Sequence, residues 1–210
     1  MHIYVVSRLF GKTPAAWEGT LQQLEKARPV MLAQYAPLRN AVVGELRHTG
    51  SGQAILDRGL SGMAATRSQL TIARKSQEAF EDCCGLLKPV VRRVLADYLR
   101  PDYAPTPVAF AGELLSGRFH ATVEDTGGDA RHLYIQAASW SDDETKAFRE
   151  LLAILAEERH GSPRSAVWFV DLGRGEISRL PAAYKRLRSD LEKTVKLMAR
   201  FTRATQAEFS

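Results

Sequence analysis

The chain has 210 residues, 45% of them hydrophobic, and its 29 lysines and arginines against 24 aspartates and glutamates give a formal net charge of +5. This composition is typical of one large globular domain, or of one domain with a helical appendage, and it excludes disorder driven by self-repulsion. The longest apolar runs span only a few residues, whereas a membrane-spanning helix needs roughly 20, and the first ten residues lack the pattern of a secretory signal. We therefore expect no membrane contact and a cytoplasmic location.

The only two cysteines, Cys83 and Cys84, are adjacent in the sequence. Adjacent cysteines do not form an ordinary mutual disulfide, and two thiolates are too few for a zinc cage. The five histidines are scattered, without the paired spacing of a zinc site. We expect both cysteines to be buried apolar side chains, and the sequence predicts no metal site.

The first third of the chain is predicted to be helical but irregular. Its apolar, β-branched start predicts a short strand over residues 1–6. Apolar residues then recur at helical spacing from Pro14, with Thr13 as a candidate N-cap, while the prolines at 29 and 37 interrupt the pattern. The predicted segments are a helix from residue 14, a broken or kinked helix over 30–47, and glycine-bearing loops at 48–53 and 59–62.

From residue 70 onward the periodicity predicts one long helix and then an alternation of strands and helices. Apolar residues fall three or four apart up to residue 98, with one kink expected at Pro89. The clearest helix begins after Ser141, which caps it, and closes at Gly161. The predicted segments are a helix over 70–98, strands at 108–110, 117–124 and 132–140 with a hairpin turn at 126–129, a helix over 141–161, strands at 165–172 and 176–180, and a final helix opened by Pro181.

This order of elements predicts the fold class. Two antiparallel strands followed by a crossover helix and a further strand make an α/β fold, in which a central mixed sheet is flanked by helices. We expect a mainly helical region over residues 1–65 and an α/β core with a basic C-terminal helix over residues 66–210.

The second half of the chain resembles a known family of nucleases. The resemblance rests on three segments, which are PVAFAGELLSGRFHATVED, RHLYIQAASWS and AVWFVDLGRGEI. They are similar to the core of the PD-(D/E)xK nuclease superfamily, particularly to exonuclease domains of the RecB and AddB type. In that family a Gly-Arg-x-Asp strand leads through a hairpin to a Glu-x-Lys or Asp-x-Lys strand. The resemblance covers about residues 74–180 and implies a restriction-endonuclease-like core.

The same resemblance implies where catalytic residues should stand. In the family, two carboxylates hold one or two Mg²⁺ ions and a lysine orients the attacking water. Here His120 stands at the aspartate position, Gln136 at the second acid and Ala138 at the lysine. Histidine is a poor ligand for Mg²⁺, glutamine carries no charge and alanine cannot orient water. We therefore expect a degenerate site that does not carry out metal-dependent cleavage and has no Mg²⁺ or Mn²⁺ cofactor.

Glu113 keeps an alternative open, because family members carry a further acid near its position. Together with His120 it could hold a transition metal, in an active nuclease whose ligands have migrated. A glutamate at the end of a strand is also commonly a solvated side chain. We further predict that His120 and Gln136 project from neighbouring strands toward one cleft, because the hairpin sets them on the same face.

The final helix carries the charge imbalance of the chain. Between residues 184 and 203 it has seven basic residues against two acids, an excess equal to the net charge of the whole chain. Its apolar residues recur at helical spacing, which predicts that they face the sheet and leave the basic residues to solvent or phosphate. Such a cluster can bind phosphates, dock an acidic protein or remain a solvated helix face. The seven basic residues are Lys185, Arg186, Arg188, Lys193, Lys196, Arg200 and Arg203.

Three functions remain open from the sequence. The first is a non-catalytic subunit on a degenerate nuclease core that binds DNA or RNA or acts as a scaffold. The second is an active metal-dependent nuclease with migrated ligands. The third is a protein-interaction module of a larger complex, in which the N-terminal helices, including Trp17 and Tyr35, bury against another chain.

Overall fold

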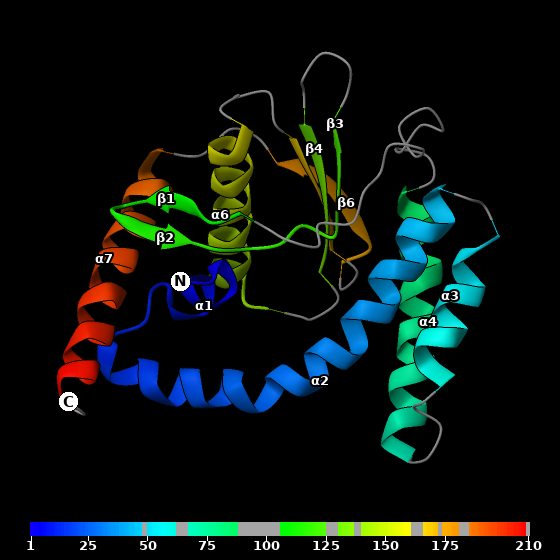
Figure 1. The fold of residues 1–210 in the computed structure, drawn as a ribbon, viewed down its shortest axis with the longest axis horizontal. Helices are drawn as coiled ribbons and strands as arrows, with labels where there is room; N and C mark the ends of the chain where they lie inside the picture. Colours follow the sequence, from blue (N-terminus) through cyan, green and yellow to red (C-terminus); the bar gives the residue numbers. More distant parts are fainter. Residues whose placement is uncertain are drawn as a thin grey trace.

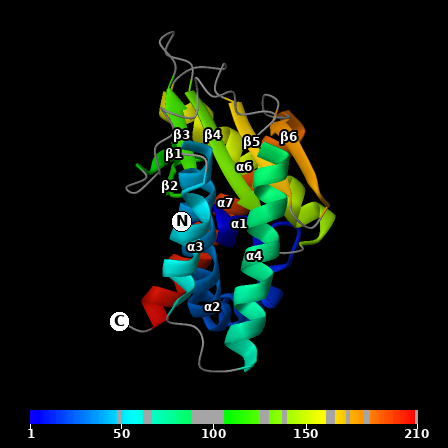
Figure 2. The same cartoon turned by 90° about the vertical axis from the view of Figure 1, so that its right-hand side faces the viewer.

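The fold is seen in a computed structural model that describes residues 1–47, 50–61, 67–87, 106–124, 130–136, 140–160, 166–171, 174–180 and 185–208. A four-stranded sheet lies at the centre, with helices on both of its faces (Figures 1 and 2). This arrangement confirms the predicted α/β fold with a mixed sheet flanked by helices. The predicted division at residue 65 falls within residues 62–66, which lie outside the described part of the chain.

The chain begins with helix α1 (Ile3–Leu9), so the strand predicted over residues 1–6 is wrong. A short apolar run is compatible with a strand and with a buried helix. The three-residue spacing of Ile3, Val6 and Leu9 is that of one helix face. All three side chains are buried. The His2 side chain caps the helix by accepting the Tyr4 N–H at 3.2 Å.

Helix α2 (Pro14–Arg47) runs unbroken through both prolines, at which we expected a break or a kink. An internal proline removes one hydrogen bond and bends a helix without necessarily ending it, and α2 is visibly curved in Figure 1. Helix α3 (Gly52–Leu60) also occupies part of both predicted loops. Helix α4 (Arg67–Leu87) confirms the start of the long predicted helix, whereas its continuation through Pro89 lies outside the described residues.

The described strands form two separate sheets. Strands β1 (Val108–Phe110) and β2 (Glu113–Leu115) are an antiparallel ribbon closed by Ala111 and Gly112. Both turn residues have positive φ, at 55° and 83°, as a tight hairpin turn requires. Strand β2 was not predicted, because alanine at a turn is not a recognisable signal.

The four-stranded sheet has the order β3-β4-β5-β6, in which only the central β4–β5 pair is parallel. Helix α6 is the crossover between the two parallel strands. Strand β3 is shorter than the strand predicted over residues 117–124, because it begins only at Ala121. The bounds are β3 (Ala121–Glu124), β4 (Ala130–Gln136), α6 (Asp142–His160), β5 (Ala166–Asp171) and β6 (Glu176–Leu180).

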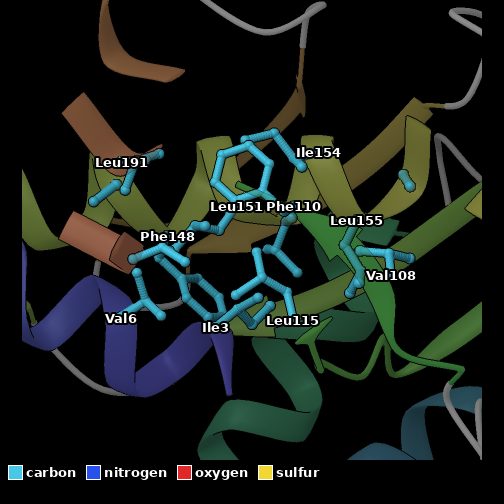
Figure 3. Close-up of a cluster of buried hydrophobic side chains, with 14 of the residues drawn as sticks. Ile3, Val6, Val108, Phe110, Leu115, Phe148, Leu151, Ile154, Leu155 and Leu191 are labelled. Carbon is cyan, nitrogen blue, oxygen red and sulfur yellow. The ribbon is translucent and has the colours of Figure 1, made fainter. Parts of the chain in front are cut away.

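Two buried clusters hold the layers together, one on each face of the sheet. Helix α6 supplies Phe148, Leu151 and Leu155 to the first cluster, which also contains residues of α1, the β1–β2 ribbon and helix α7 (Lys185–Glu208) (Figure 3). The second cluster joins the C-terminal half of α2, α3 and α4 to the other sheet face, and both cysteines are buried in it, as predicted. No helix in the described part of the chain is long and apolar enough to cross a membrane.

Candidate functional site

Polar side chains gather at one end of the four-stranded sheet. Strand β3 runs antiparallel to β4, and β4 runs parallel to β5. The start of β3 therefore lies at the same end of the sheet as the carboxyl ends of β4 and β5. His120 directly precedes β3, Gln136 ends β4 and Asp171 ends β5, with Gln136 and Asp171 opposite each other in register. Ligand sites of open α/β sheets commonly form beyond the carboxyl ends of parallel strands.

His120 is fixed by three contacts to β4. Its backbone N–H donates to the Leu133 carbonyl at 2.7 Å, and its Nδ1 accepts the Ile135 N–H at 2.7 Å. Its ring stacks on Tyr134 with 4.6 Å between the ring centroids. Because Nδ1 accepts a hydrogen bond, the neutral ring carries its proton on Nε2.

The surroundings keep His120 uncharged. Burial, together with the positive charges of Arg39 and Arg118, lowers the pKa of His120 to about 3. The imidazole is therefore neutral at pH 7. Its Nδ1 lone pair is already used by Ile135, so the geometry is poor for a metal ligand through that atom.

Gln136 and Asp171 complete this end of the sheet. Gln136 is 4% exposed, and its Oε1 has no hydrogen-bond partner among the described residues. Asp171 accepts the backbone N–H of Arg174 at 3.2 Å, and the Arg174 guanidinium also pairs with Asp142 at the start of α6. Asp171 and Arg174 were not predicted as site residues, although an acid directly after the apolar run of β5 is a recognisable strand-end signal.

The structure does not bring Glu113 to this site. Glu113 lies in β2 and forms an ion pair with Arg203 of α7. The β1–β2 ribbon lies on the α7 side of α6, while the four-stranded sheet lies on its other side (Figure 1). Glu113 is thus paired with a base on the α7 side of α6, and a metal shared by Glu113 and His120 stays a prediction. Ala138 lies outside the described residues, and no group of three or more metal-binding side chains occurs within the described part.

His120 and Gln136 do lie at the same end of the sheet. The His120 ring stacks on Tyr134, and Gln136 follows Tyr134 by two residues, which places it on the same face of β4. The contacts of the two side chains differ, because His120 binds the β4 backbone whereas Gln136 is enclosed beside Asp171.

The basic residues of α7 form the second candidate site. Leu191, Val195 and Met198 are buried, as predicted, but they pack in the cluster with α1, α6 and the β1–β2 ribbon and not on the four-stranded sheet that we expected them to face. Tyr184 lies outside the described residues. Lys193, Lys196, Arg200 and Arg203 are all exposed, and the helical spacing places them in one stripe opposite the buried face. We call these four residues the α7 stripe.

Carboxylates compensate part of this charge. Arg188 pairs with Glu157 and Glu158 of α6, and it is only partly exposed. Within the α7 stripe, Lys193 pairs with Asp190, and Arg203 pairs with Glu113. Lys196 and Arg200 have no acidic partner in the described part of the chain. The side chains of Lys185 and Arg186, in the first turn of the helix, lie outside that part.

Comparisons with known proteins assign no family to this chain. No protein-family model matches it, and no curated protein matches it. Among solved structures, "Crystal structure of SSO0001" is similar with a TM-score of 0.38 and 14% sequence identity, over 94% of this chain and 75% of that one.

Proposed function

We propose that this chain is a non-catalytic nucleic-acid-binding subunit built on a nuclease-like sheet, and that the α7 stripe contacts the phosphate backbone. The order of elements supports the nuclease resemblance. Strands β3 and β4 form an antiparallel pair, α6 is the crossover helix that follows, and β5 lies parallel to β4.

The residues at the sheet end do not fit the family's metal. Mg²⁺ takes hard oxygen ligands and needs carboxylate charge. The two strand positions instead hold His120, a neutral imidazole with one nitrogen already bonded, and Gln136, an uncharged amide. Asp171, the carboxylate opposite Gln136 in register, is occupied by Arg174. This donor set favours binding over hydrolysis.

The α7 stripe is the observation that carries the proposal. Its four cations lie within eleven residues of helix, and the ten steps from Lys193 to Arg203 span about 15 Å at roughly 1.5 Å per residue. Apolar packing holds the opposite face of α7 against the core, so the stripe is presented on a rigid support. Contacts of lysine and arginine to phosphate are independent of base sequence and release counterions. The expected activity is therefore binding of DNA or RNA with little sequence preference.

Charge reversal in the stripe tests this proposal. Lys196→Glu with Arg200→Glu changes two exposed cations that have no acidic partner among the described residues. We expect weaker binding of fluorescein-labelled DNA and RNA, and a slope of log affinity against log salt that falls by roughly 0.7 to 0.9 per lost phosphate contact. Fluorescence anisotropy at several salt concentrations measures both quantities.

The matched control is Arg74→Glu with Lys75→Glu, because these residues are exposed on α4 and the change in net charge is the same. The control variant should bind like the parent chain. Equal affinity for all three proteins, or no binding by the parent, contradicts a role of α7 in nucleic-acid binding. Binding of an acidic protein through the same residues then becomes the leading function, since a basic helix face also suits such a partner.

A further inference from the structure

Helix α7 carries apolar side chains beside its cations. Among the described residues, two large hydrophobic side chains are exposed, Leu197 at 42% and Leu114 at 63%. Leu197 follows Lys193 by four residues and precedes Arg200 by three, so it is a neighbour of both on the surface of the helix. An exposed leucine therefore lies directly beside the α7 stripe.

An aromatic ring continues this apolar surface by one helical turn. Phe201 follows Leu197 by four residues and is partly exposed. Its ring packs against the first buried cluster, where it meets the buried Trp17 of α2 at 78°, with 5.6 Å between the ring centroids. Figure 1 shows the start of α2 beside the C-terminal half of α7. The Phe201 ring is thus held in place by the core. We call Leu197 and Phe201 the apolar row.

Helix geometry places the apolar row and the α7 stripe side by side. At about 3.6 residues per turn, the four cations lie on one side of Leu197, whereas Phe201 lies on its other side, toward the buried face of α7. Two of these cations, Lys196 and Arg200, have no acidic partner in the described part of the chain. The helix therefore presents a cationic strip and an apolar strip that both run along its axis.

A single-stranded nucleic acid has the chemistry to match both strips. Its phosphates are anionic, and its unpaired bases expose flat apolar faces that stack on aromatic side chains with little dependence on base identity. In a duplex the bases are stacked in pairs, so a protein surface that follows the backbone meets phosphates and sugars instead. Only the single strand offers an apolar partner to Leu197 and Phe201.

We propose that α7 binds single-stranded DNA or RNA in preference to duplexes, with phosphates on the α7 stripe and bases against the apolar row. The inference rests on the proposed function, because the same helix supplies the phosphate contacts. It adds a second kind of contact to them. The complementary charge brings the strand to α7, and the apolar row distinguishes unpaired bases from paired ones.

Replacement of the exposed leucine tests the contact with bases. Leu197→Gln removes the apolar side chain, and glutamine has a helix propensity close to that of leucine. The matched control is Leu114→Gln, because Leu114 is also exposed and its side chain points to the opposite face of β2 from Glu113, the partner of Arg203.

Fluorescence anisotropy in EDTA compares labelled single-stranded and duplex DNA of equal length. We expect the parent chain to bind the single strand more tightly than the duplex. Leu197→Gln should weaken single-strand binding by roughly threefold to tenfold and leave duplex binding unchanged, because only the apolar contact is lost. The control variant should bind both forms like the parent.

Phe201→Leu tests the aromatic ring separately. Leucine keeps an apolar contact with the first buried cluster but has no flat face on which a base can stack. We expect single-strand binding to fall by roughly fivefold or more, with duplex binding unchanged. Thermal unfolding of each variant verifies that it is folded.

The outcomes separate the two proposals. If the duplex binds as tightly as the single strand, or if neither variant weakens single-strand binding, the base contact is wrong. The proposed function then stands when charge reversal in the α7 stripe still weakens binding. A loss that is equal for single strand and duplex also overturns the base contact, because it reflects the packing of α7. If the parent binds neither form, the proposed function fails and the preference for single strands fails with it.

Discussion

At the scale of a single residue, the contacts of His120 at the end of the four-stranded sheet determine the charge of its imidazole. Its Nδ1 accepts a backbone N–H, its ring stacks on Tyr134, and two arginines act on it. The accepted hydrogen bond, the burial and the two positive charges favour the uncharged imidazole. Protonation during acidification must therefore break the bond to Ile135 and place a cation beside two others.

This environment predicts a pH dependence of stability. The pKa of His120 is lowered to about 3 in the folded chain, whereas an unfolded histidine has a pKa of about 6.5. The unfolded state thus binds more protons between these values, and the stabilisation is complete above pH 6.5 and is lost as the pH falls toward 3. Between pH 7 and pH 4 the loss should be on the order of 2 kcal/mol, allowing for the exposed part of the ring.

Urea unfolding at pH 7 and pH 4 measures this effect in the parent and in His120→Asn. The asparagine does not titrate, so the stability difference between the two pH values should be smaller in the variant. An equal pH dependence of the two proteins contradicts the neutral assignment of His120.

At the scale of elements, the close crossing of α2, α3 and α4 depends on a small residue. A Cβ at Gly52, the first residue of α3, meets the Ala41 carbonyl oxygen of α2 at 2.7 Å and Phe80 Cζ of α4 at 2.7 Å. The contact with a backbone atom cannot be relieved by a side-chain rotation. At Gly85 of α4, by contrast, a Cβ would have no atom of a neighbouring element within 4 Å among the described residues.

These two glycines predict opposite effects of the same substitution. Gly52→Ala should lower the free energy of unfolding by about 1–3 kcal/mol, because overpacking forces the helices apart. Gly85→Ala should raise it by about 0.5–1 kcal/mol, because alanine favours the helix and restricts the unfolded chain. Chemical denaturation of both variants at one pH provides the check. Shifts in the same direction would be inconsistent with the helix packing described.

The elements of the second half could be predicted because their patterns are long and uniform. The apolar stripe of α7 and the capped start of α6 at Ser141 are set by local sequence, and the structure has both. Helix α1 was missed because so short an apolar run does not distinguish a strand from a helix. Pro29 and Pro37 led us to expect a broken or kinked helix, but α2 continues through both. The tertiary contacts of α2 outweigh the helix stability that the prolines cost locally.

The sites were harder to predict than the elements, because they depend on contacts between distant residues. The bond between Arg203 and Glu113 joins positions 90 residues apart, and no local pattern indicates it. Sequence reasoning identified the positions of His120 and Gln136 from a motif, but it gave neither their hydrogen bonds nor their charge state.

At the scale of the whole molecule, α2 connects the two layers that carry the candidate sites. Trp17 near its start belongs to the cluster that supports α7, and Leu38 near its end belongs to the cluster that supports β3 and β4. The α7 stripe and the His120 end of the sheet are thus held by one continuous framework.

The central claim is that the chain binds nucleic acid without cleaving it. The most direct measurement incubates end-labelled DNA and RNA with the parent chain in EDTA, Mg²⁺ or Mn²⁺, and resolves each sample on a native and a denaturing gel. We predict a shifted band of similar intensity under all three conditions and full-length nucleic acid on the denaturing gel. Cleavage in Mg²⁺ or Mn²⁺ that disappears in Asp171→Ala, or the absence of a shifted band under every condition, would contradict it.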